Sequence, residues 1–167
     1  MQFDVSQSES KKAAIPHEIF LFNLIGNHIL IFIASLGMFL SFPYPLYLVP
    51  VISVSCLLYT LWRAKRSLRV DPWFALCHWQ IASRRAKVFI GMLSLLGTVS
   101  FLGWLGYAYL GMMKEAIYAF IVGIGLLPTM MTMLVLIIME SDGLYQARQC
   151  RVSAKWVLDK FPREGMS

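Results

Sequence analysis

The chain has 167 residues, of which 58% are hydrophobic and only 14% are charged, and its mean hydropathy is +0.64. Soluble domains are about 45–50% apolar and about 25% charged, so this composition excludes an ordinary soluble domain and indicates an integral membrane protein. The net charge of +6 does not indicate nucleic-acid binding, because the basic residues flank apolar runs, where membrane topology and anionic lipid headgroups account for them.

The polar residues 1–17 predict a flexible cytoplasmic lead, in which Pro16 suits the first position of a helix. The membrane domain is expected to follow over residues 18–139. Its first span covers about 19–41, which is enough residues to cross a hydrocarbon core about 30 Å thick. The aromatic and proline-rich residues 42–45 predict a tight turn at its end.

The first span carries the strongest polar signal. Asn23 and Asn27 are four residues apart and share one helix face, and His28 lies on an adjacent line. An ionisable side chain inside a span is a functional candidate, as a proton relay or an anion ligand. The alternative is that His28 stays neutral and that the asparagines hydrogen-bond between helices. Both hypotheses place these side chains toward protein rather than lipid.

A second span is predicted over about 46–62, followed by a cytoplasmic helical hairpin over 63–87. Asp71 and Pro72 suit the N-cap and first position of the second arm of that hairpin. The hairpin contains a basic face expected to contact anionic headgroups, formed by Arg63, Lys65, Arg66, Arg69, Arg84, Arg85 and Lys87.

The third and fourth spans are predicted over about 88–112 and 117–139. Pro128 lies inside the fourth span, where it removes one backbone donor and should kink the helix. Transporters use broken helices of this kind to expose backbone groups to substrate. The alternative is a packing kink whose free carbonyl is satisfied by Thr129.

The charge distribution predicts the orientation. Of the 15 basic residues, two lie in the lead, seven in the hairpin and five in the tail, and Lys114 alone lies on the other side. Lysine and arginine near span ends favour the cytoplasmic face. The expected fold is therefore an all-α, four-transmembrane-helix bundle with both termini in the cytoplasm and helices extending into it. The tail, 140–167, is expected to be partly helical, with an apolar seam that docks on the hairpin, on another protein or along the headgroups.

The sequence contains none of the familiar motifs of soluble enzymes, such as a P-loop, GxGxxG, HExxH, GxSxG or CxxC. We therefore expect no enzyme activity, no catalytic residues, no cofactor and no metal site. Haem is not expected either, because bis-histidine ligation requires two imidazoles at the same depth. His17 precedes the first span, His28 lies inside it, and His78 lies in the hairpin.

Three hypotheses for function remain. The preferred one is a small non-catalytic subunit of a larger assembly in the bacterial inner membrane, such as secretion, envelope or respiratory machinery, with a membrane-protein partner or self-association. The alternative is a homo-oligomeric transporter or channel that uses the polar face of the first helix and the kinked fourth helix. The third is a lipid-modifying enzyme that uses Glu18, Glu140 or Asp142, which should lie near one membrane level.

Overall fold

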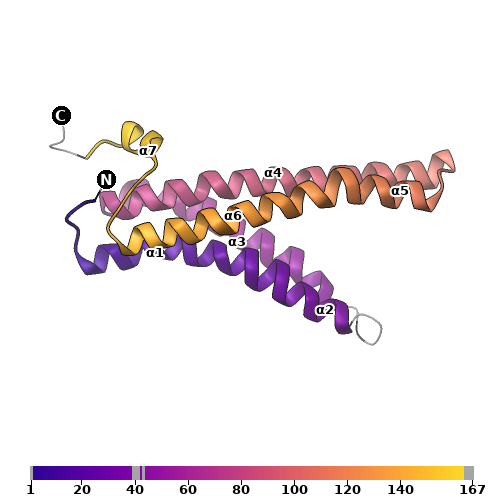
Figure 1. The fold of residues 1–167 in the computed structure, drawn as a ribbon, viewed down its shortest axis with the longest axis horizontal. Helices are drawn as coiled ribbons and strands as arrows, with labels where there is room; N and C mark the ends of the chain where they lie inside the picture. The colour runs from indigo at the N-terminus through magenta and orange to yellow at the C-terminus, as the bar shows by residue number, and fades with distance from the viewer. Residues whose placement is uncertain (1, 39–41, 43, 164–167) are drawn as a thin grey trace. The chain divides into compact units, whose positions relative to one another are not determined.

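The computed structural model describes residues 2–38, 42 and 44–163, and these residues are helical apart from short connections and one isolated bridge between Gln2 and Arg151. Four helical segments are long and apolar enough to cross a membrane (Figure 1): Gln7–Met38, Pro45–Val70, Trp73–Leu110 and Lys114–Arg148. The prediction of an all-helical chain with four such helices is confirmed.

The third and fourth of these segments are longer than a bilayer requires. About 20 residues cross the hydrocarbon core, whereas these segments hold 38 and 35 residues. At about 1.5 Å per residue the third is about 57 Å long, so much of it extends beyond the core. The chain forms two compact units, one of Met1–Ala86 with Ile137–Ser167 and the other of Lys87–Leu136.

In the first unit, helix α1 (Gln7–Leu21) begins well before the start that was predicted at Pro16. The Ser6 hydroxyl accepts a hydrogen bond of 3.2 Å from the Glu9 backbone N–H and caps the helix. Burial of residues such as Ala13, which is 0% exposed, offsets the cost of Pro16 inside the helix. The prediction of a flexible lead is therefore wrong for residues 7–17.

The first span continues from α1 as the π-helix η1 (Phe22–Ile31) and then as α2 (Phe32–Met38). At the end of η1, the Phe32 N–H reaches the carbonyl of Asn27, five residues back. This wider turn changes which side chains share a face, and π-turns occur frequently at functional sites. The last residues of the predicted span, 39–41, lie outside the described residues.

Helix α3 (Pro45–Val70) leads directly into α4 (Trp73–Leu110), as the predicted hairpin requires. Asp71, the predicted N-cap of α4, is the C-cap residue of α3, and its carboxylate receives two hydrogen bonds, of 2.6 and 2.8 Å, from the Arg63 guanidinium. The Phe74 backbone N–H instead donates to Glu9 Oε1 at 3.2 Å. A carboxylate of α1 thus satisfies a free donor at the start of α4.

The residues outside the expected membrane core in this unit, 2–17, 63–86 and 140–163, share one hydrophobic core and are called the terminal module below. This core contains Phe3, Ala13, Ala14, Phe74, Ala75, Cys77, Ile81, Ala147, Val152 and Val157. The predicted seam of the tail packs on it through Leu144, Ala147, Ala154, Leu158 and Phe161. Of the three predicted alternatives for the seam, docking on the hairpin is the one that the structure shows.

The tail is not one continuous helix. Helix α6 (Leu127–Arg148) is followed by a turn, in which Cys150 has a φ of +55°, and then by α7 (Lys155–Lys160). A left-handed φ is uncommon outside glycine. The Phe3 N–H donates to the Cys150 carbonyl at 2.8 Å, so the N-terminal residues hold this turn.

The second unit is a helical hairpin in which α4 lies beside α5 (Lys114–Phe120), the π-helix η2 (Ile121–Leu126) and the first part of α6 (Figure 1). Gly111 closes the hairpin with a φ of +61°, a conformation that glycine adopts without steric cost.

Candidate functional site

Three ionisable side chains far apart in the sequence meet inside the terminal module. His17 comes from α1, His78 from the first turns of α4, and Glu140 from α6, and each is 0% exposed. The packing of these three helices in the first unit brings the three side chains together. We call these residues, together with Arg85, the histidine–glutamate cluster.

Both nitrogens of His17 are engaged. Nδ1 lies 2.5 Å from Glu140 Oε2, and Nε2 lies 2.9 Å from His78 Nδ1. The two imidazoles are almost perpendicular, with an angle of 88° between their planes. His17 is therefore the central member of a Glu–His–His chain.

Two proton arrangements satisfy this chain. In one, neutral His17 donates from Nδ1 to Glu140 and accepts at Nε2 from His78. In the other, His17 is a cation that donates from both nitrogens, and His78 accepts at Nδ1. Both arrangements keep the two hydrogen bonds of His17.

Arg85 supplies the positive charge opposite Glu140. Its Nη1 donates to the Met139 carbonyl at 2.8 Å and lies 3.3 Å from Glu140 Oε1. The Arg85 side chain is 16% exposed, whereas the Glu140 side chain is 0% exposed. An ionised carboxylate is costly to bury unless it is paired and hydrogen-bonded, and His17 and Arg85 together provide those partners.

Gly143 lets His17 approach α6 closely. A Cβ at this position would lie 2.6 Å from His17 Cε1, 2.8 Å from Nδ1 and 3.0 Å from Arg85 Nη1. These distances are shorter than carbon atoms tolerate, so any larger residue would displace the imidazole. The cluster therefore depends on a glycine one turn after Glu140.

Burial lowers the pKa of His78 to about 3, from an ordinary value of 6.5. His17 and Arg85 lower it further through their charges, while the backbone of Arg151 acts in the opposite direction. His78 is thus neutral near pH 7 in the folded protein. Its Nε2 is buried and meets no hydrogen-bond partner at bonding geometry within the described residues.

The cluster joins three helices and is closed to solvent. His17, His78 and Glu140 are inaccessible to solvent, so a substrate would reach them only after the helices separated. Among residues 2–38, 42 and 44–163, no group of three or more His, Cys, Asp or Glu side chains is arranged to hold a metal ion.

The polar residues of the first span face protein, as predicted. Asn23 and Asn27 are both 0% exposed. Asn27 Nδ2 donates to the Val49 carbonyl of α3 at 2.8 Å and to Asn23 Oδ1 at 3.2 Å. His28, which is only partly buried, bonds through Nδ1 to the Asn23 carbonyl at 2.8 Å. The asparagines therefore connect η1 to α3.

This polar contact is incompletely satisfied. Asn23 Nδ2, Asn27 Oδ1 and Ser53 Oγ are buried and have no hydrogen-bond partner within the described residues. Ser53 lies on α3, one turn beyond Val49. An unsatisfied buried polar atom costs about 1–3 kcal/mol. The contact between η1 and α3 therefore contains more hydrogen-bonding atoms than are needed to join the two helices.

Pro128 and Thr129 are the second and third residues of α6, which follows η2. Thr129 Oγ1 lies 2.8 Å from the Gly125 carbonyl and 3.2 Å from the Met92 carbonyl of α4. The hydroxyl thus satisfies a carbonyl near the irregular turns and also contacts the neighbouring helix. This geometry gives Thr129 a role in packing α6 against α4.

The basic face of the hairpin is only partly free for headgroups. Arg63 lies over the Trp79 ring at 5.0 Å and Arg84 over the Trp156 ring at 4.8 Å, both within the terminal module. The Asp71 carboxylate raises the pKa of Arg63. With Arg85 in the cluster and Arg66 over the Trp62 ring at 5.5 Å, four of the seven predicted residues have contacts within the chain; Lys65, Arg69 and Lys87 are exposed.

The structure gives separate partners to the three carboxylates proposed for a lipid enzyme. Glu18 lies 3.2 Å from Arg148 in an exposed ion pair, and Asp142 accepts from Gln146. Glu140 is sealed inside the cluster. They do not converge on one surface.

Sequence reasoning missed the cluster because it assigned His17 and His78 to different depths, and the direct bond between their rings corrects that assignment. The sequence did contain one indication that His17 and Glu140 could meet. His17 immediately precedes the first span and Glu140 immediately follows the fourth, so both lie at one membrane boundary. Nothing in the sequence showed that the start of α4 would come back to that level.

Comparisons of the chain with protein-family models, with curated proteins and with solved structures each found no match.

Proposed function

We propose that this protein is a non-catalytic subunit of a larger assembly in the bacterial inner membrane, with both termini in the cytoplasm. The assembly belongs to the secretion, envelope or respiratory machinery. The observation that carries the proposal is the complete burial of His17, His78 and Glu140. These three ionisable side chains, which could otherwise serve as catalytic groups, hydrogen-bond to one another and so join α1, α4 and α6.

The surface of the second unit supports the same function. Gly91 and Gly97 of α4 have no atom within 4 Å of an added Cβ, and Ser94 and Thr98 are exposed beside them. Small residues on a membrane helix permit close approach of another helix. We expect the partner to pack against this face.

The test is gentle detergent extraction of the tagged full-length protein, followed by native mass measurement and identification of copurifying chains. A stoichiometric partner is expected. Gly97→Leu should remove that partner because its side chain blocks close approach, while Leu102→Met, also on an exposed position of α4, should retain it. Recovery of the wild-type chain alone, or as a pure homo-oligomer, would refute the proposal.

A second candidate, a small homo-oligomeric transporter or channel, is favoured by the unpaired polar atoms of Asn23, Asn27 and Ser53. Buried polar groups beyond those needed for packing are typical of ion or substrate paths. Loss of a transport activity in His28→Ala, with assembly intact, would favour this function over the accessory one. An unchanged activity in both His28→Ala and Asn27→Leu would eliminate it.

A further inference from the structure

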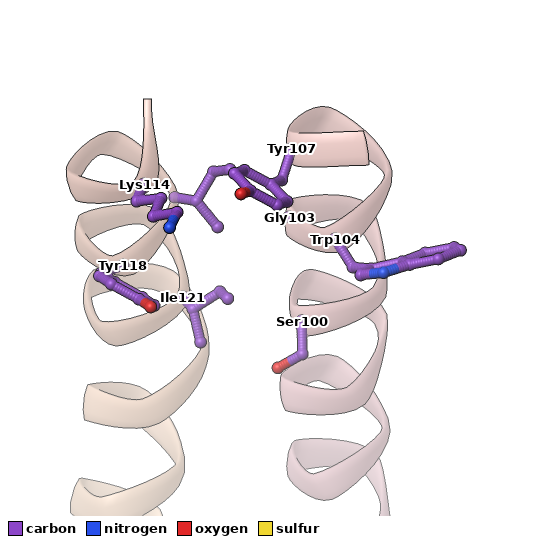
Figure 2. A pocket seen from close by; sticks show the side chains of 8 residues that line it. Ser100, Gly103, Trp104, Tyr107, Lys114, Tyr118 and Ile121 are labelled. Carbon is purple, nitrogen blue, oxygen red and sulfur yellow. The ribbon is translucent and has the colours of Figure 1, made fainter. Parts of the chain in front are cut away.

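A pocket lies between the helices of the second unit, at the end of the hairpin that carries Lys114 (Figure 2). Its volume is about 310 Å³. It is lined by one stripe from α4 and one from α5–η2: Ser100, Gly103, Trp104 and Tyr107, and Lys114, Ile117, Tyr118 and Ile121. Each stripe recurs at steps of three and four residues, as one side of a helix does, and Figure 2 shows the Trp104 ring directed away from the opposite helix.

The walls of the pocket are mainly apolar, and its rim is polar. Gly103 lies opposite two isoleucines, and a Cβ there would come within 3.1 Å of both Ile117 Cγ2 and Ile121 Cδ1. Closer to the hairpin turn, the Lys114 ammonium lies 5.6 Å from the centroid of the Tyr107 ring. Figure 2 shows the Tyr107 and Lys114 side chains directed toward each other across the mouth.

Lys114 is the one basic residue between positions 88 and 139. In the part of the chain that the structure describes, it forms no ion pair. Its neighbour Glu115 is exposed and does not line the pocket. A cation at the end of a membrane helix, with tyrosines beside it, lies at the level of lipid headgroups.

We propose that this pocket binds one anionic phospholipid. An acyl chain lies along the apolar wall that Ile117 and Ile121 contribute to the pocket, and the phosphate pairs with Lys114. The hydroxyls of Tyr107 and Tyr118 lie at the level of the glycerol esters.

The chemistry of the pocket, apolar walls beside one cation, favours a lipid over free phosphate. Free phosphate would use Lys114 but leave the apolar walls without a contact. A phospholipid matches both parts of the pocket.

The test uses purified full-length protein in detergent, titrated with phosphatidylglycerol or with phosphatidylcholine and followed by native mass spectrometry. One tightly retained phosphatidylglycerol is expected. Lys114→Gln should weaken its binding about fivefold, the effect of one basic residue near a charged headgroup, and should abolish the preference over phosphatidylcholine. Glu115→Gln, which removes the neighbouring negative charge but no residue that lines the pocket, should not weaken binding.

A second variant tests the acyl-chain site. Ser100→Leu places a larger apolar side chain in the pocket and should reduce retention of both lipids, while circular dichroism confirms that the variant is folded. The proposal is overturned if Lys114→Gln keeps the wild-type affinity and preference, if Ser100→Leu retains lipid normally, or if inorganic phosphate displaces the lipid.

Discussion

Substitution of Gly143 by alanine provides a sharp test of the histidine–glutamate cluster. In an ordinary helix this change stabilises by about 1 kcal/mol. Here the added Cβ would lie 2.6 Å from His17 Cε1, so the ring must move by about 0.8 Å to reach an ordinary contact distance of about 3.4 Å. Both ring nitrogens are bonded, and therefore the movement must lengthen at least one of those bonds.

The expected result is a net loss of stability of about 3 kcal/mol. Overpacking a tight site costs about 1–3 kcal/mol, and weakening a hydrogen bond to a charged group costs about 1.5–3 kcal/mol. The gain in helix propensity offsets about 1 kcal/mol of this sum. Unfolding by titration with a denaturing detergent, followed by circular dichroism, measures the difference.

Gly97→Ala is the matched control. Nothing lies within 4 Å of a Cβ at this position of α4, so the variant should be as stable as the wild type or more stable by up to about 1 kcal/mol. If Gly143→Ala shifts the unfolding midpoint in the same direction and by the same amount as Gly97→Ala, the close packing of His17 against α6 is not real.

Two further predictions concern His78 and Thr129. Because the folded-state pKa of His78 is about 3 and its ordinary value is 6.5, the unfolded chain binds more protons between these values, and stability should fall by about 2 kcal/mol from pH 7.5 to pH 5. The free energy of unfolding, measured at both pH values, should depend less on pH in His78→Asn, whose side-chain amide keeps a donor near Nδ1 for the bond to His17. An equal pH dependence in the variant would contradict the lowered pKa of His78. Thr129→Val should lower the free energy of unfolding by about 1 kcal/mol, because two carbonyls lose the hydroxyl that donates to them. Thr98→Val, at an exposed position, should lower it by less than half as much in the same assay. Equal losses in the two variants would contradict a stabilising role for the Thr129 hydroxyl.

The sequence was sufficient to predict the helices and insufficient to predict the site. Long apolar runs and the turn residues between them identify four helices, because hydrocarbon length and backbone hydrogen bonding allow few alternatives. The burial of Asn23 and Asn27 also followed from their spacing on one face. These predictions depend on local patterns only.

The histidine–glutamate cluster depends on how far α4 and α6 extend beyond the membrane and on the rotation of each helix about its axis. His78 and Arg85 are seven residues apart on one face of α4, but that spacing does not show which helix they meet. Likewise, aspartate is a residue type favoured at N-caps. The sequence does not show that the Asp71 carboxylate pairs with Arg63 or that Glu9 accepts the hydrogen bond from the Phe74 N–H. Long-range contacts decided both outcomes.

The 123 residues that separate His17 from Glu140 have a consequence for biogenesis. Until the fourth helix has been synthesised and inserted, His17 and Arg85 have no anion to pair with, although α1 and α4 are already present. Every shorter intermediate therefore exposes polar groups beside the membrane that the finished protein conceals. The membrane proteases and chaperones that survey such groups have a direct means of distinguishing an incomplete chain from a complete one.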